Sequence, residues 1–270
     1  MGEYSEVIRK GAEEILKQNL FSDTLASIAL EDIGACQHVV RTILGRDDIE
    51  IISVKGQYRL LNLTSKDTIL DAYAQDSTGR KINIEIQRRD TVDHARRIRY
   101  YGSMIDKSIL DKGAYYDELP DVYIIYISET DLLGVGEAVY PVTKTLGKSG
   151  IPYDDGNYVV FANAAIDDGS DTAKLMKYFE TADPDDMSQG PLSERIHYLK
   201  CEKGGNDEMC KAAEDLYNKG REQGIEQGQS EKAKAMAISM HSDGVTVDLI
   251  AKYANVSVDL VRKWLGLTIA

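Results

Sequence analysis

A predicted β-hairpin constrains the fold of this chain more than any other feature. Residues 68–76 and residues 81–87 both show a period of two, and Ser77-Thr78-Gly79 separates them. A period of two is typical of β-strands, and a three-residue loop that contains glycine in the left-handed position suits an antiparallel turn. The sequence therefore predicts two strands that pair directly with each other.

Two carboxylates of this hairpin are predicted to face each other. Strands are depleted in Asp, so Asp71 is out of place among its apolar neighbours. If Asp76 pairs with Arg80 across the turn, Asp71 lies opposite Glu85, with the two Cβ atoms about 4.5–5.5 Å apart. Like charges at that distance repel, and a bridging Mg²⁺, or Mn²⁺ in its place, would explain the pair. The backbone carbonyl of Ile86 would be a further oxygen ligand.

An ordinary solvated face of an antiparallel hairpin is the alternative interpretation, and such faces are very common. It accounts well for Asn83, Glu85 and Gln87, which alternate with isoleucines. It accounts poorly for Asp71. A one-residue slip in the turn would also remove the pairing of the two acids, so spacing alone leaves both interpretations open.

Five arginines follow the hairpin within twelve residues. Phosphate contacts dominate the affinity of proteins for nucleic acid, and a cluster beside a reactive site would grip the DNA backbone. The alternative is a solvated helix face, which is the usual meaning of a run of charges. The predicted DNA-binding residues are Arg88, Arg89, Arg96, Arg97 and Arg99.

The remaining pattern predicts an α/β fold, a mixed β-sheet flanked by helices. Residues 122–128 are almost continuously apolar, as expected for a strand buried on both faces. Gly45 is expected to end a helix. The expected helices cover residues 4–19, 23–44 and 90–111, the last with Thr91 as N-cap, and the other expected strands cover residues 50–54, 58–63 and 158–162.

The C-terminal third is predicted to be a helical tail. We expect a nuclease-like domain over residues 1–180, a linker over residues 181–191, which contain two prolines and three acids, and a helical region over residues 192–270. That region should have a loop at Gly204-Gly205 and a long polar helix over 207–241. Residues 245–265 are compatible with a helix-turn-helix, or with a helical hairpin that makes an oligomer contact.

Composition bounds the class of protein. The chain has 270 residues, a net charge of -13 and 43% hydrophobic residues, typical of a globular protein with a substantial core. Its three cysteines form no CxxC pair, which favours a reducing environment. No signal peptide or membrane span is expected, so we predict a cytoplasmic protein without a membrane partner. The acidic charge argues against a surface coated with basic residues but allows a local basic patch.

The hairpin and the segments after it resemble the PD-(D/E)XK nuclease family transposases, also called recombination-promoting nucleases. The resemblance covers roughly residues 20–165. The residues that carry it are Leu70-Asp71, Asp76-Ser-Thr-Gly79, Asn83-Ile-Glu-Ile-Gln87, Arg96-Arg-Ile-Arg-Tyr-Tyr-Gly-Ser-Met-Ile-Asp106 and Leu119-Pro-Asp-Val-Tyr-Ile-Ile-Tyr-Ile127.

This resemblance implies a restriction-endonuclease-like fold and magnesium-dependent cleavage of DNA. Asp71 and Glu85 would hold the metal, and Gln87 would stand where the wider superfamily has a lysine. Glutamine can orient a water or contact a phosphate, but it carries no positive charge, so the metal would have to do more of the work. Glu31 or Asp32 would be an additional acid from a leading helix.

The predicted function is therefore metal-dependent hydrolysis of DNA by Asp71, Glu85 and Gln87, linked to recombination or to a mobile element. The acidic charge and the absent lysine motivate a rival hypothesis, in which the protein keeps the nuclease fold without turnover and acts as a DNA-binding or assembly module. A homo-oligomer formed through the C-terminal helices is compatible with either function.

Overall fold

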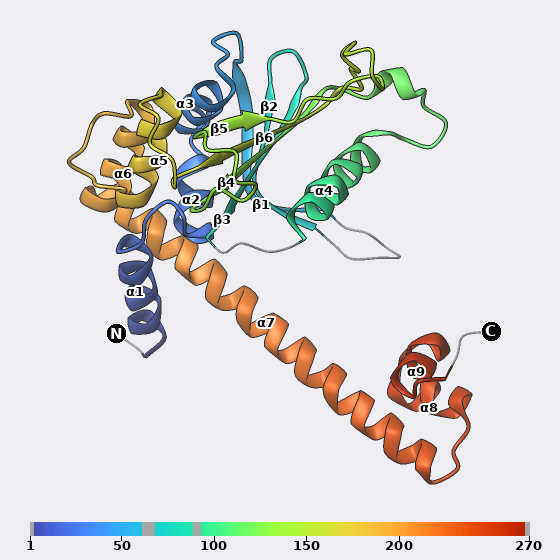
Figure 1. Ribbon diagram of the computed structural model, residues 1–270. Coiled ribbons are helices and arrows are strands. Elements are labelled where there is room, and N and C mark those ends of the chain that lie inside the picture. Colours follow the sequence, from blue (N-terminus) through green and yellow to red (C-terminus); the bar gives the residue numbers. More distant parts are fainter. Residues whose placement is uncertain (1–2, 61–67, 89–92, 268–270) are drawn as a thin grey trace. The chain divides into compact units, whose positions relative to one another are not determined.

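The computed structural model describes residues 3–60, 68–88 and 93–267, and the chain forms two compact units, Met1–Ala212 and Ala213–Ala270. The first unit contains a mixed six-stranded sheet with helices on both faces (Figure 1). The predicted fold class, a mixed sheet flanked by helices, is confirmed. Among the described residues, no helix is both long and apolar enough to cross a membrane.

The sheet has the strand order β1-β2-β3-β4-β6-β5. Strand β2 is antiparallel to both of its neighbours, β1 and β3, whereas β3, β4 and β6 run parallel, and β5 is antiparallel to β6. The strands are β1 (Ile51–Leu60), β2 (Thr68–Asp76), β3 (Lys81–Gln87), β4 (Val122–Ser128), β5 (Val139–Pro141) and β6 (Asn157–Asn163).

Helix α4 covers one face of this sheet, and α2, α3 and α5 pack against the other (Figure 1). On the α4 side, Ile98 and Ile105 form a core cluster with Ile124 and Tyr126 of β4. The helices of this unit are α1 (Glu3–Leu16), α2 (Asp23–Leu30), α3 (Ile33–Leu44), α4 (His94–Ile109), the short 3-10 helix η1 (Tyr116–Glu118), α5 (Asp171–Thr181) and α6 (Pro191–Cys201).

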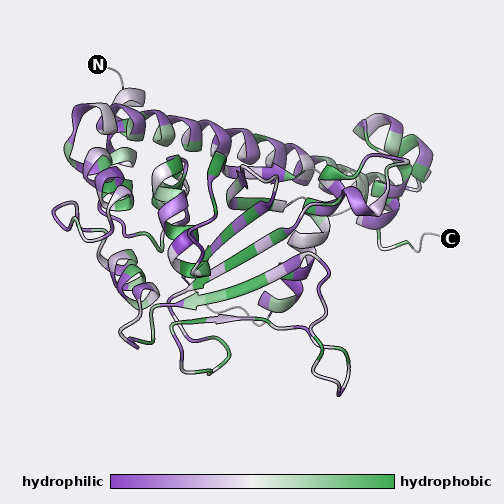
Figure 2. Ribbon diagram, turned by 90° about the horizontal axis from the view of Figure 1, so that it is seen from above, coloured by the Kyte–Doolittle hydropathy of each residue, from purple (hydrophilic) through white to green (hydrophobic). Residues whose placement is uncertain are grey.

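Strand β4 is the centre of the core. Every residue of β4 is buried, because it has a parallel neighbour on each side and helices above and below. Its continuous apolar sequence is the pattern expected for such a strand. Figure 2 shows hydrophobic residues along the strands of the sheet. The long helix α7 (Lys203–Ser242) is mostly hydrophilic by contrast.

Several elements differ from the expectation. Residues 23–44 form two helices instead of one, because Asp32 caps α3 by accepting a hydrogen bond from the Ala35 N–H (2.8 Å). Two expected strands are a single strand, β1, and residues 61–63 lie outside the described residues, as does Thr91. Strand β5 and helix α5 were not predicted.

The expected loop at Gly204-Gly205 is wrong, because both glycines lie within helix α7 (Lys203–Ser242). A Cβ atom on Gly205 would lie 2.0 Å from the carbonyl oxygen of Tyr198. Glycine is therefore present here for close approach to α6, and it does not interrupt the helix. Helix α6 itself packs against α2 and α3 and buries Leu192, Ile196 and Leu199.

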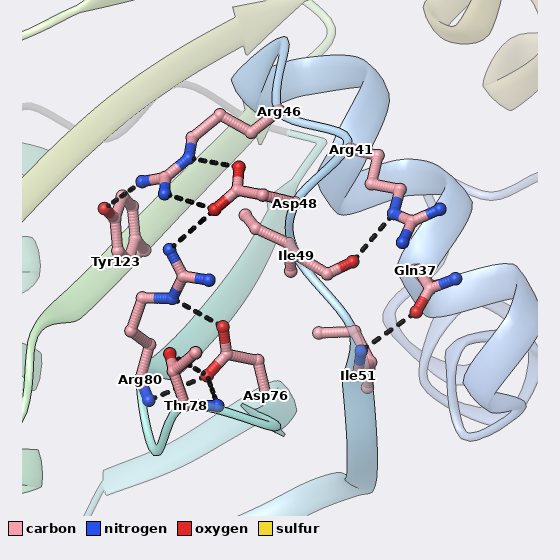
Figure 3. Close-up of polar contacts among 10 residues, drawn as sticks. All are labelled: Gln37, Arg41, Arg46, Asp48, Ile49, Ile51, Asp76, Thr78, Arg80 and Tyr123. Atoms are coloured by element: carbon pink, nitrogen blue, oxygen red, sulfur yellow. Dashed lines mark hydrogen bonds and ion pairs between the residues drawn. The ribbon is translucent and has the colours of Figure 1, made fainter.

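A network of charged residues holds the β2–β3 turn (Figure 3). The fully buried Asp76 accepts hydrogen bonds from the Thr78 N–H (3.0 Å) and hydroxyl (2.9 Å) and from the Arg80 N–H (2.9 Å), and it forms an ion pair with the Arg80 side chain. Arg80 also contacts Asp48 (3.2 Å), which Arg46 binds with two nitrogens. The turn is thus tied to the loop that precedes β1.

This turn sets the register of the hairpin. The Asp76 N–H donates to the Arg80 carbonyl (3.1 Å), as predicted. The antiparallel ladder then runs from the pair Gln75 and Lys81 to the pair Ala72 and Ile84. This register determines which side chains of the two strands point to each face of the sheet, because a slip of one residue would move every side chain of a strand to the other face.

The second unit consists of the remainder of α7 with α8 (Val247–Ala254) and α9 (Val258–Trp264). Ala237 of α7 packs with Ile250, Ala251 and Val261 in a small apolar core. The two short helices agree with the expectation for residues 245–265. Their N-caps are Thr246 and Ser257, and Ser257 accepts a hydrogen bond from the Leu260 N–H (3.2 Å).

Candidate active site

The candidate site lies at the end of the β2–β3 hairpin remote from the turn. Asp71 and Glu85 are the next residues of the two strands beyond the last ladder pair, Ala72 and Ile84. Glu85 aligns with Tyr126 in the parallel register between β3 and β4, and Tyr126 belongs to the core cluster on the α4 side. The two acids therefore lie on the face of the sheet that α4 covers.

Asp71 is buried and held by its neighbours. The residue is 8% exposed. One carboxylate oxygen accepts a hydrogen bond from the Ile86 N–H (2.9 Å), and the other accepts one from the Gln57 amide (3.4 Å). Gln57 has a φ of 44° in strand β1, a left-handed conformation that is uncommon for residues other than glycine. Strained backbone of this kind clusters at functional sites.

Glu85 is buried more deeply, with 1% of the residue exposed. One of its oxygens accepts a hydrogen bond from the side-chain amide of Asn83 (3.1 Å). The amide oxygen of Asn83 is buried and has no hydrogen-bond partner within the part of the chain that the structure describes. Buried polar groups are rarely left unpaired, so this oxygen offers an acceptor to a water or a ligand beside Glu85.

Both carboxyl groups have strongly raised pKa values. Burial raises the pKa of Asp71 to about 7, and the charge of Asp23 adds to this, whereas the Ile86 N–H lowers it. Burial also raises the pKa of Glu85 well above its ordinary value, and the negative charge of Asp71 raises it further. Burial disfavours the charged form of each acid, and each charge disfavours the other.

The donor set fits a small divalent cation. Within the described residues, no group of three or more His, Cys, Asp or Glu side chains could hold a metal ion. Mg²⁺ does not need such a cage, because it is commonly held by one or two carboxylates together with water and substrate phosphate. A cation would also offset the desolvation and repulsion that raise both pKa values. The Ile86 N–H donates to the Asp71 carboxylate. The Ile86 carbonyl therefore belongs to the same short stretch of backbone that contacts this carboxylate.

Gln87 contacts an arginine from the covering helix. The amide oxygen of Gln87 accepts a hydrogen bond from the guanidinium of Arg97 (3.0 Å). Arg97 lies in the first turn of α4, and it also contacts Asp93 (3.4 Å). Its positive charge lowers the pKa of both Asp71 and Glu85. The structure therefore places a cation beside the two acids and Gln87.

The other predicted DNA-binding arginines occupy different positions. Arg96 and Arg99 are exposed on α4. Arg88 donates to Asn19 (2.7 Å) and forms an ion pair with Glu129 (3.3 Å). Arg89 lies outside the described residues.

Sequence reasoning missed one acid near the site, Asp23. It is the first residue of α2, and its charge raises the pKa of Asp71. An acid in the first turn of a helix is common for reasons of the helix dipole alone, so its position gave no signal. The acids considered from the sequence have structural contacts instead: Glu31 accepts from the Gly56 N–H (3.2 Å), and Asp32 caps α3.

Comparison with known families gives one result. Residues 40–141 match the family model described as PD-(D/E)XK nuclease family transposase. No curated protein and no solved structure shows significant similarity to the chain. The matched segment begins in α3, ends with β5 and includes the β2–β3 hairpin and α4. Over residues 40–141, which contain Asp71, Glu85 and Gln87, the chain is thus similar to the PD-(D/E)XK nuclease family transposases.

Proposed function

We propose that this protein is a metal-dependent endonuclease that hydrolyses DNA phosphodiester bonds. The observation that carries the proposal is the pair of buried acids, Asp71 and Glu85, adjacent on one face of a hairpin inside a nuclease-family domain. Two charges buried this closely are unfavourable without a compensating group. A structural role would be filled better by apolar residues, so the pair is best explained by a bound cation.

In this proposal Asp71 and Glu85 hold Mg²⁺, with Mn²⁺ as a substitute and the Ile86 carbonyl as a further ligand. The metal would supply a Lewis acid that polarises the phosphate and increases the acidity of a bound water. The Ile86 N–H and the Gln57 amide orient the Asp71 carboxylate, and Asn83 orients Glu85. Gln87 positions a water or a phosphate oxygen through its amide.

The DNA backbone would be bound along α4 and the end of β3. Arg96 and Arg99 are exposed and can contact phosphates directly. Arg88 would have to exchange its contacts with Asn19 and Glu129 for a phosphate, and the sequence places Arg89 next to it. Contacts of this kind position the DNA without reading its sequence.

Residues 1–180 remain our proposed nuclease unit, with residues 181–191 as its linker. The C-terminal helices α8 and α9 are proposed to bind DNA as a helix-turn-helix or to make an oligomer contact. Light scattering on the protein with and without residues 243–270 separates these roles, because an oligomer contact through α8 and α9 requires the number of chains per particle to fall on their removal. An unchanged number of chains per particle dismisses that contact.

Cleavage of supercoiled plasmid tests the proposed function. We expect the wild-type protein to nick or linearise the plasmid with Mg²⁺ or Mn²⁺, and we expect a chelator to abolish the reaction. Glu85→Ala should be inactive, because it removes one of the two metal-binding carboxylates. Equal activity of both proteins would indicate a contaminant or another site. Inactivity of both with Mg²⁺ and Mn²⁺ would favour the binding module without turnover.

A further inference from the structure

We infer that Arg97 is the catalytic cation of this site and that its guanidinium contacts the phosphate that is cleaved. This inference rests on the proposed nuclease function. It means that Arg97, on helix α4, supplies the positive charge that a lysine at the position of Gln87 would have supplied. Sequence analysis gave Arg97 only a general role in gripping DNA, together with four other arginines.

The charge balance of the site calls for such a group. Two carboxylates and a phosphodiester carry three negative charges, and one divalent cation carries two positive charges. The attack of water places additional negative charge on the phosphate oxygens in the transition state. A preorganised cation in a site protected from water stabilises that developing charge more than it would in bulk solvent.

The contacts of Arg97 hold it in place for this role. Its Nη1 donates to the amide oxygen of Gln87 (3.0 Å), and its Nη2 contacts the carboxylate of Asp93 (3.4 Å). Gln87 is two residues from Glu85 on the same face of β3. One end of the guanidinium is therefore tied to the strand that carries the acid, and the other end is tied to the start of α4.

Arg97 still has donors available for a substrate. A guanidinium carries five N–H groups in a rigid fork that matches two phosphate oxygens. The two contacts just given are those it makes within the described part of the chain, and its side chain remains 25% exposed. It can thus bind a phosphate while Gln87 and Asp93 keep its orientation.

The neighbouring arginines that the structure describes do not share this position. Arg96 and Arg99 are exposed on α4, and Arg88 is engaged by Asn19 and Glu129. They can contribute to DNA affinity, whereas Arg97 adjoins Gln87. The role of Gln87 is then also clearer, since its amide oxygen positions the cation and leaves its NH₂ group free to face a water or a phosphate.

The test measures cleavage and binding separately. Single-turnover cleavage is measured at saturating DNA, and DNA affinity is measured in Ca²⁺, which is used here to limit turnover. For Arg97→Met we expect the rate to fall at least ~10²-fold, as when one donor to a developing anion is removed, while the dissociation constant changes by less than ~3-fold. Arg97→Lys should retain part of the rate, because it keeps the charge but loses the fork. Lys107→Met removes a cation from the last turn of the same helix and is the matched control.

A double variant makes the test independent of folding effects. Gln87→Lys combined with Arg97→Met returns a cation to the site from strand β3, and we expect it to cleave at least ~10-fold faster than Arg97→Met alone. An Arg97→Met protein that cleaves at the wild-type rate overturns the inference but leaves the nuclease function standing. A loss confined to DNA affinity also overturns it, since Arg97 would then only grip DNA. A wild-type protein that cleaves no DNA overturns the proposed function and this inference together.

Discussion

Asp71→Asn is expected to abolish cleavage and at the same time to stabilise the metal-free protein. The substitution removes a proposed metal ligand, and the loss of several kcal/mol of transition-state stabilisation should slow cleavage at least ~10³-fold. Asparagine is neutral at every pH, so it also removes the energetic cost of a buried charge. The cleavage assay and thermal unfolding in the presence of a chelator measure the two effects.

The pH dependence of this stabilisation has a definite sign. The pKa of Asp71 in the folded protein is about 7, above its value of about 4 in an unfolded chain. The wild type therefore has the full contribution of this group below pH ~4 and loses it as the pH rises through 7, at up to about 1.4 kcal/mol per pH unit. Asp71→Asn should match the wild type near pH 4 and should unfold at a higher temperature at pH 8, by up to roughly 8–16 °C, since a rise in pKa of about three units is worth up to ~4 kcal/mol and about 1 kcal/mol corresponds to roughly 2–4 °C.

Addition of Mg²⁺ should reverse the order of the two proteins. A ligand that binds only the folded state stabilises it, and metal binding requires ionised carboxylates. The melting temperature of the wild type should therefore rise with Mg²⁺ more at pH 8 than at pH 5.5, and that of Asp71→Asn should not. Asp117→Asn, at an exposed position in η1, is the control for both measurements. A variant less stable than wild type at pH 8 without metal would refute the argument.

Asp76→Ala is expected to destabilise the first unit strongly. Asp76 is fully buried, and the Arg80 side chain beside it is 11% exposed. Without Asp76 the buried guanidinium of Arg80 keeps, among the described residues, only the exposed Asp48 as an ion-pair partner, and the loss of a buried partner typically costs about 3–5 kcal/mol. Because whole domains are stable by only about 5–15 kcal/mol, urea unfolding should show a much lower midpoint.

The control for Asp76→Ala lies in the same network. Asp48→Asn weakens contacts to Arg46 and Arg80, but Asp48 is exposed to solvent, and exposed ion pairs contribute at most about 1 kcal/mol. We therefore expect Asp48→Asn to lower the urea midpoint less than Asp76→Ala does. Equal losses of stability in the two variants would refute the role assigned to the buried Asp76.

The two ends of the hairpin should respond to pH in opposite directions. Burial would raise the pKa of Asp76, but its bonds to Arg80 and Thr78 outweigh burial and hold that pKa below its ordinary value. A lowered folded pKa contributes stability above the unfolded value of about 4 that is lost as the pH falls. Asp76 thus weakens the fold in acid, whereas Asp71 weakens it toward neutral pH.

Local signals account for the parts of the fold that could be predicted. The turn chemistry and the period of two determine where β2 and β3 begin and end, and the register follows from the pairing of Asp76 with Arg80. Strand β4 could be predicted from the sequence because a strand buried on both faces needs an apolar sequence. A three-residue strand such as β5 carries too few residues for a period, and it forms because β6 offers it an edge.

The unpredicted features of the site depend on tertiary packing. Asp23 approaches Asp71 only because α2 packs against β1, β2 and β3. Arg97 meets Gln87 only because α4 crosses the same face of the sheet, and no spacing in the sequence separates it from Arg96 or Arg99. The left-handed Gln57 likewise has no local cause that the sequence reveals.

The bonds that close the Asp76–Arg80 turn make its length a determinant of the proposed activity. An inserted or deleted residue there would turn Asp71 and Glu85 toward opposite faces of the sheet, even though every functional side chain remained in the gene product. Evolution can vary the amino acids of this turn within the limits of its hydrogen bonds, but it cannot readily vary their number. If the proposed nuclease activity is lost among descendants of this sequence, a single-codon insertion or deletion at the far end of the hairpin is sufficient to cause that loss, even where both acids are retained.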